Sequence, residues 1–159
     1  YSSPSMPGVK ELDLGESEMV VLYPDEVFPH KPEKLAIEDL ADTELIGIWG
    51  SGPLGDLVWN HLARSNIQIK SSLQVDTYFI AAKLVSQGLG CCTIDKYTAL
   101  GNLSDNTSMA SFEPSLPIQL KGLYLDSQPL PRVCEEFTEF VKTEVQQVQA
   151  LTAITQGYE

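Results

Sequence analysis

One stretch of the sequence, residues 75–100, constrains the fold most, because it combines a helix start, a helix, a glycine stop and an apolar run. Asp76 or Thr77 can cap a helix whose apolar residues recur at helical spacing, and a glycine can end it. The run at residues 89–94 is then typical of a strand buried on both faces, as in a parallel α/β sheet. With residues 67–75 as the entering strand, the stretch predicts a strand–helix–strand crossover of a doubly wound sheet, whose ligands bind at the carboxyl ends of the strands.

The remaining elements are short and alternate along the chain. We expect strands at residues 19–23, 45–49 and 118–125, helices or helical turns at 36–40, 54–65, 97–100 and 129–149, an extended entry at 1–15 and a polar loop at 101–108.

Composition favours a folded domain and argues against a nucleic-acid surface on this chain. The 159 residues fit one domain or two small lobes, and 43% of them are hydrophobic. Ten Lys and Arg residues against 22 Asp and Glu residues give a net charge of −12, whereas phosphate binding needs clustered positive charge. The three cysteines, an odd number, do not suggest a disulfide framework, so we expect a reducing cytoplasm.

The segment GSGPLG at residues 50–55 is the best ligand-binding candidate. It connects a predicted strand to a predicted helix, and the first N–H groups of a helix are unpaired and lie at the positive end of its dipole. A carboxylate can therefore bind at this helix start, beside Gly52 and Pro53, with the Ser51 hydroxyl as a further donor. The alternative is that these residues only form a tight turn.

Asp76 and Thr77 occupy the equivalent position at the start of the next predicted helix. Thr77 can donate a hydrogen bond to a carboxylate, and Asp76 can hold an ammonium or guanidinium group. Helix capping explains both residues without any ligand. Trp49, at the end of its strand, can wall the pocket or simply belong to the core.

Other reactive residue types form no catalytic or metal-binding pattern. His30 and His61 have no partner at the spacing of zinc ligands. Cys91 and Cys92 fall in a predicted buried strand, where a thiol behaves as a small hydrophobic group. Since no nucleophile elbow is present either, we expect no enzymatic activity, no metal and no cofactor.

Three motifs, taken in order, carry a family resemblance: MVVLYPDEVFPHKPEKLAIEDLAD, LVSQGLG and LKGLYLDSQPLPRVCEEFTEFVKTEV. With their spacing, they resemble the effector-binding domain of LysR-type transcriptional regulators over residues 12–145. Within that family the chain looks most like the branch that senses basic amino acids and opines, where Asp-Pro-Phe-Thr-Ala follows the strand. Residues 95–99 here are Asp-Lys-Tyr-Thr-Ala, so Lys96 replaces the proline.

The resemblance implies an α/β fold of two Rossmann-like lobes with mixed sheets, the type II fold of periplasmic binding proteins, with the first lobe incomplete. Residues 1–19 would be a first-lobe remnant and hinge entry, 20–122 the second lobe, and 123–159 the return to the first lobe with the closing helix. The family's winged helix-turn-helix and the strands that cover the closing helix are not found. We therefore expect a carboxy-terminal piece of the family's chain, and Tyr1 in place of a methionine agrees with excision from a longer one.

The function that the resemblance implies is ligand sensing by a cytoplasmic transcription regulator. The effector would be a small carboxylate, an amino acid or opine-like molecule, bound between the lobes. The protein would form a homo-oligomer, a dimer or tetramer, would contact DNA only through a helix-turn-helix outside this chain, and would have no membrane partner. An alternative of the same fold is a periplasmic-type solute-binding protein of a transport system.

Overall fold

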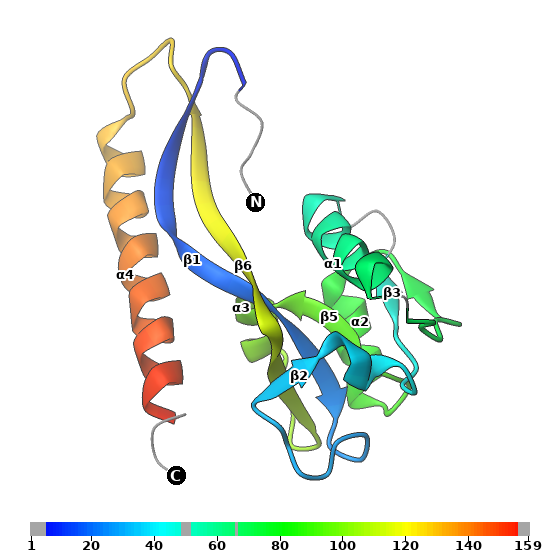
Figure 1. Cartoon of the computed structure of the whole chain (residues 1–159). Coiled ribbons are helices and arrows are strands. Elements are labelled where there is room, and N and C mark those ends of the chain that lie inside the picture. The colour runs from blue at the N-terminus through cyan, green and yellow to red at the C-terminus, as the bar shows by residue number, and fades with distance from the viewer. Residues whose placement is uncertain (1–5, 49–51, 66, 156–159) are drawn as a thin grey trace. The chain divides into compact units, whose positions relative to one another are not determined.

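The computed structural model describes residues 6–48, 52–65 and 67–155, with side chains up to residue 149. Strands and helices alternate along the chain (Figure 1). In order, they are β1 (Val9–Pro24), β2 (Lys34–Ala36), the 3-10 helix η1 (Ile37–Leu40), β3 (Gly47–Ile48), α1 (Gly52–Arg64), β4 (Gln74–Val75), α2 (Tyr78–Ser86), β5 (Cys92–Asp95), α3 (Lys96–Leu100), β6 (Thr107–Leu125) and α4 (Arg132–Thr155).

The chain forms two compact units. Unit 2 is residues 17–118, and unit 1 combines residues 1–16 with residues 119–159. The long strands β1 and β6 belong partly to each unit.

The sheet of unit 2 is mixed, and this confirms the predicted α/β fold class. The strand order is β2-β6-β1-β5, with β2 parallel to β6 and β5 antiparallel to β1. A second pair, β3 and β4, is parallel, and a parallel bridge from Leu45 to Cys91 connects this region to the start of β5. The sequence predicts that the apolar run at residues 89–94 is a strand of a parallel sheet. This prediction was wrong for its main pairing, because β5 pairs with β1 in the antiparallel direction.

The core of unit 2 covers both faces of the β1–β5 pair. Because Val21 pairs with Thr93 and Val20 with Ile94, alternate residues of each strand share a face. On one face Met19 and Val21 belong to a cluster with residues of α1 and β6, including Phe112. On the other face Val20 and Ile94 pack with small residues of α2 and α3. A strand pair with two covered faces is a rigid base for a site.

Three predictions about strands were wrong in their extent. Residues 67–75 form a strand only at β4, apart from an isolated bridge at Lys70. The segment is held by other means: Ile67 and Ile69 pack on the core, and the Glu44 carboxylate accepts a hydrogen bond from the Ser72 hydroxyl at 2.6 Å. Conversely, β1 and β6 begin at Val9 and Thr107, about ten residues before the predicted starts.

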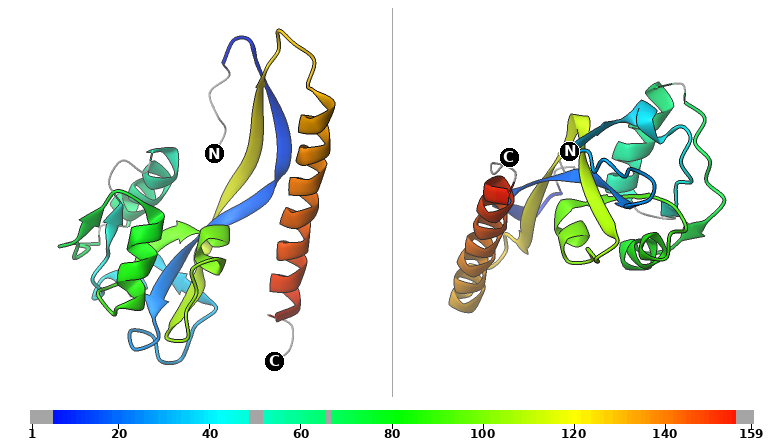
Figure 2. Two further views of the ribbon diagram at one scale, coloured as in Figure 1. Left: turned by 180° about the vertical axis from the view of Figure 1, so that it is seen from behind. Right: turned by 90° about the horizontal axis from the view of Figure 1, so that it is seen from below.

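Unit 1 consists of one end of the β1–β6 ribbon with α4 beside it (Figure 2). Val145 is buried against the ribbon, where Gly15 has φ +139° and a Cβ would lie 2.5 Å from Val145 Cγ1. The Gln149 side chain donates to the Glu16 carbonyl at 2.6 Å. The predicted closing helix is confirmed, with Arg132 as its first residue.

Candidate functional site

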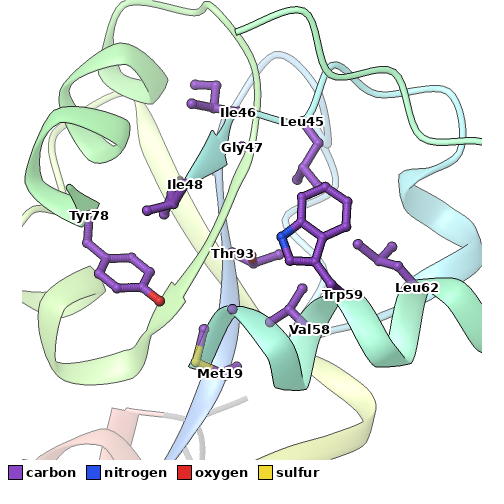
Figure 3. Close-up of a pocket in the computed structure, with 11 residues that line it drawn as sticks. Met19, Leu45, Ile46, Gly47, Ile48, Val58, Trp59, Leu62, Tyr78 and Thr93 are labelled. Carbon is purple, nitrogen blue, oxygen red and sulfur yellow. The ribbon is translucent and has the colours of Figure 1, made fainter. Parts of the chain in front are cut away.

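A small hollow, partly open to solvent, lies within unit 2 between α1 and the strands (Figure 3). Its walls come from β1, the segment that ends in β3, α1, the start of α2 and β5. The lining residues are Met19, Leu45, Ile46, Gly47, Ile48, Gly55, Val58, Trp59, Leu62, Tyr78 and Thr93.

The floor of the hollow follows from strand register. Val21 pairs with Thr93, and Met19 lies two residues before Val21, so Met19 and Thr93 point to the same face of the β1–β5 pair. Met19 is fully buried, whereas Thr93 is partly exposed. The floor therefore combines an apolar side chain with a hydroxyl.

One wall is a single face of α1. Gly55, Val58, Trp59 and Leu62 occur at i, i+3, i+4 and i+7, the spacing of one helix face. Val58 and Leu62 are buried, while Trp59 is 44% exposed. Figure 3 shows the rings of Trp59 and Tyr78 reaching into the hollow from different elements.

The start of α2 is capped by Thr77, not Asp76. Thr77 has extended backbone angles, φ −141° and ψ 149°, and its Oγ1 accepts a hydrogen bond from the Ile80 N–H at 3.3 Å. The Thr77 hydroxyl acts as an acceptor in that bond, so its proton is suited to donate to a ligand. Tyr78, the first residue of α2, lines the hollow.

The start of α1 supplies the other predicted residues. The helix begins at Gly52, whose φ of +57° favours glycine, and Pro53 suits a first turn because it needs no hydrogen-bond acceptor for an N–H group. Both residues are exposed, and Gly55, at the end of the same first turn, is buried and lines the hollow. Ser51 and Trp49 lie outside the described residues.

The hollow thus touches the first turns of α1 and α2, through Gly55 and Tyr78. None of the four described candidates (Gly52, Pro53, Asp76 and Thr77) lines it, so their role as ligand-binding residues stays a prediction. Sequence reasoning missed Trp59, Tyr78 and Thr93. Trp59 had a detectable signal, since it lies four residues after Gly55 on the same helix face, whereas Thr93 depends on strand register.

A polar network lies on the opposite face of β1 from Met19. The Glu18 carboxylate accepts hydrogen bonds from Lys96 Nζ at 2.9 Å and from the hydroxyls of Ser111 and Ser115 at 3.0 Å each. Burial raises the pKa of Glu18, but the bonds from Lys96 and the two serines outweigh it, and the net pKa is lowered. The network connects β1, α3 and β6.

Cys91 and Cys92 are buried, as expected. Burial raises the pKa of Cys91 to about 11 and that of Cys92 to about 12, so both thiols are protonated at neutral pH.

Comparison with known families decides the class of protein. A family model described as "LysR substrate binding domain" matches residues 1–146. The chain belongs to the LysR substrate-binding domain family. A curated relative, the HTH-type transcriptional regulator DgcR of Pseudoalteromonas sp, is 44% identical over 137 residues, which cover 86% of this chain and 47% of the relative. The chain therefore spans about half the length of that relative.

Solved structures of LysR effector domains confirm the type II periplasmic-binding-protein-like fold. The effector binding domain of QuiR in complex with shikimate matches with a TM-score of 0.69 and 22% identity, covering 92% of this chain and 69% of that one. The CcmR regulatory domain of Synechocystis PCC6803 in complex with 2-PG matches with a TM-score of 0.73 and 12% identity, covering 91% and 71%.

The comparisons favour a regulator over the transport-type solute-binding protein, and the family is one of regulator domains rather than of enzymes. No helix in the described part of the chain is long and apolar enough to cross a lipid bilayer.

Proposed function

We propose that the chain is the effector-sensing part of a LysR-type transcription regulator and binds a small carboxylate, an amino acid or opine-like molecule, between its two lobes. One observation carries the proposal: the first turns of two helices adjoin the same hollow in unit 2. Helix starts present unpaired N–H groups and positive potential, which suit an anion. The QuiR and CcmR domains, which share the fold, were solved with small molecules bound.

Each predicted site residue has a distinct role in this proposal. The N–H groups at the start of α1, beside Gly52 and Pro53, bind the effector carboxylate, and Ser51 adds a hydroxyl. The Thr77 hydroxyl donates to the same carboxylate from the start of α2. Asp76 is exposed beside Thr77 and pairs with an ammonium group of the effector.

The proposed mechanism is ligand linkage between lobe arrangements. In this proposal residues 20–122 form the second lobe, and residues 1–19 and 123–159 belong to the first. An effector that binds the closed arrangement more tightly than the open one shifts their populations by its difference in affinity. In the whole protein, which we place in the cytoplasm, this change in populations alters DNA binding by a helix-turn-helix outside this chain. No reaction is catalysed in this mechanism.

Assembly into a homo-oligomer, a dimer or tetramer, is part of the proposal. Within unit 2, Phe79, Ile80 and Leu89 are 59%, 45% and 47% exposed, and the first two lie on α2. Exposed apolar side chains of this size on neighbouring positions are typical of a protein–protein contact. Lys83 Nζ lies 5.8 Å from the Phe79 ring centroid, which leaves a charged edge beside this surface.

One face of α4 carries exposed apolar side chains that we expect to pack against another segment. Val133, Phe137 and Phe140 lie on one face and are 70%, 65% and 60% exposed. We propose that first-lobe segments of the whole protein pack on this face, because the curated relative is about twice as long as the matched region.

A thermal-shift screen tests the ligand proposal. Neutral, basic and acidic amino acids, opines and aromatic acids are each added to the protein. A ligand present at 100 times its Kd should raise the free energy of unfolding by about 2.7 kcal/mol. Stabilisation by one class that is lost in Thr77→Ala but kept in Thr77→Ser supports the site. No stabilisation by any compound contradicts the proposal.

A further inference from the structure

The hollow in unit 2 contains no charged side chain among its described lining residues. Buried aliphatic groups, among them Leu45, Val58 and Leu62, form most of the lining. Its polar side-chain atoms are the hydroxyls of Thr93 and Tyr78 and the indole N–H of Trp59. Such a lining can form a few hydrogen bonds with an uncharged ligand group but cannot balance the charge of an ionised one.

Three carboxylates on the strands and loops near the hollow are engaged elsewhere. Glu18 lies on the opposite face of β1 from Met19 and is paired with Lys96. Asp95 shares the Thr93 face of β5, but its carboxylate accepts from the Thr98 N–H at 3.0 Å and caps α3. The Glu44 carboxylate accepts from Ser72. These carboxylates are therefore not arranged as counter-ions for a ligand in the hollow.

The two aromatic residues are placed to contact a ligand. Trp59 projects from α1 and Tyr78 from the start of α2, and both rings reach into the hollow (Figure 3). Trp59 is 44% exposed, so part of its side chain is in contact with water and is accessible to a ligand. Aromatic walls favour apolar or planar groups.

We infer that the side chain of the effector, here called its arm, enters this hollow and is uncharged. The preferred effectors are then carboxylates with a neutral aliphatic or aromatic arm, and Trp59 determines this preference. The inference rests on the proposed function and refines it, because it separates neutral amino acids from the basic ones and from acidic opines. A charged arm would lose its hydration and find no opposite charge. A neutral arm would gain affinity, about fourfold for each methylene buried.

Calorimetric titration of the protein with a matched set of compounds tests the inference. Racemic norleucine, lysine and glutamate share an amino-acid head but differ in the charge of the arm, and glycine lacks an arm. We expect norleucine to bind more tightly than glycine, and at least about 30-fold more tightly than lysine or glutamate. Tightest binding by lysine or glutamate overturns the inference and leaves the proposed function standing. Absence of binding by all four contradicts the amino-acid form of the proposed function, and the inference falls with it.

Two variants test the role of Trp59. Trp59→Ala should weaken norleucine binding about tenfold and leave glycine binding unchanged, and Trp59→Lys should shift the preference towards glutamate. Phe137→Ala is the matched control, because Phe137 is an exposed aromatic residue on α4 that does not line the hollow. Circular dichroism and thermal melting verify folding, and Trp59→Phe replaces Trp59→Ala if the latter unfolds. Unchanged norleucine affinity in folded Trp59→Ala and Trp59→Lys proteins overturns the assignment of Trp59.

Discussion

The two units of the chain bury apolar side chains to very different extents. Unit 2 has two buried clusters, one on each face of the β1–β5 pair. In unit 1, Val145 is the only buried hydrophobic residue among those described, while Leu123, Leu125 and Phe137 are more than half exposed. Unit 2 therefore has the core of a stable lobe, whereas unit 1 is a ribbon and a helix with an apolar face uncovered.

This difference indicates that the chain supplies the complete core of unit 2, whereas the apolar face of unit 1 needs further segments to cover it. The candidate site is built on unit 2, whose strands and helices are held by packing on both sides. Unit 1 depends on a few contacts, such as those of Val145 and Gln149. Mutations should therefore affect the two units unequally.

The largest expected effect is that of a core truncation in unit 2. Phe112 is 1% exposed and lies in the first cluster, so Phe112→Ala should lower the free energy of unfolding by about 3–5 kcal/mol. Phe137→Ala in unit 1, where the ring is 65% exposed, should change it by less than about 0.5 kcal/mol. Urea unfolding followed by far-UV circular dichroism measures both. Equal losses would contradict the contrast between the units.

Alanine at two constrained glycines should come next. At Gly90, φ is +143° and a Cβ would lie 2.5 Å from the Glu44 carbonyl oxygen, which accepts from the Cys91 N–H. Because that backbone cannot move without breaking the bridge, Gly90→Ala should cost about 2–3 kcal/mol. At Gly15 the close atom belongs to the Val145 side chain on α4, so Gly15→Ala should cost less, about 1–2 kcal/mol.

Hydrogen exchange locates these two effects. Gly15→Ala should speed exchange in α4 and leave the amides of β5 protected, whereas Gly90→Ala should speed exchange throughout unit 2. If Gly15→Ala deprotects unit 2 as strongly as Gly90→Ala, the units are not independently stabilised.

A smaller effect is expected at the start of α2. Thr77→Ala removes the hydrogen bond to the Ile80 N–H and should cost about 1 kcal/mol. Thr77→Ser keeps a capping hydroxyl and should cost less. Asp76→Ala should stay within about 0.5 kcal/mol, because Asp76 is exposed and is not the cap. Thermal melting of the three variants checks the ranking, and a larger loss for Asp76→Ala would reverse the assignment of the cap.

The smallest effect is a pH dependence at Glu18. Its pKa is lowered in the folded protein, so the stabilisation that it provides is present above the unfolded-state pKa and is lost as the pH falls through the lowered folded pKa. Glu18→Gln should flatten this acid limb of the stability curve. Glu113→Gln is the control, because Glu113 forms an exposed ion pair with Lys34 at 3.5 Å. An unchanged acid limb in Glu18→Gln would show that the network contributes nothing to it.

The sequence correctly predicted those features that depend only on residues close together in the chain. The Thr77 cap, the start of α1 near Gly52 and the buried cysteines follow from residue types at fixed spacing. The length of β6 was missed because Pro114 and Pro117 interrupt its pattern, although the strand continues through them.

Long-range pairing explains the other errors. Residues 67–75 alternate like a strand, but Ile67 and Ile69 pack on the core while the backbone makes few strand pairs. Met19 and Thr93 meet in the hollow only because of the β1–β5 register, which no local pattern encodes.

The most direct test of the account is a two-dimensional ¹H–¹⁵N NMR titration of the protein with norleucine. If a carboxylate binds at the helix starts, saturable shifts should be largest for the amides of Gly52, Gly55 and residues 77–80, with smaller changes at Thr93. Saturable shifts confined to α4 or to β6, with none at the helix starts, would contradict the central claim.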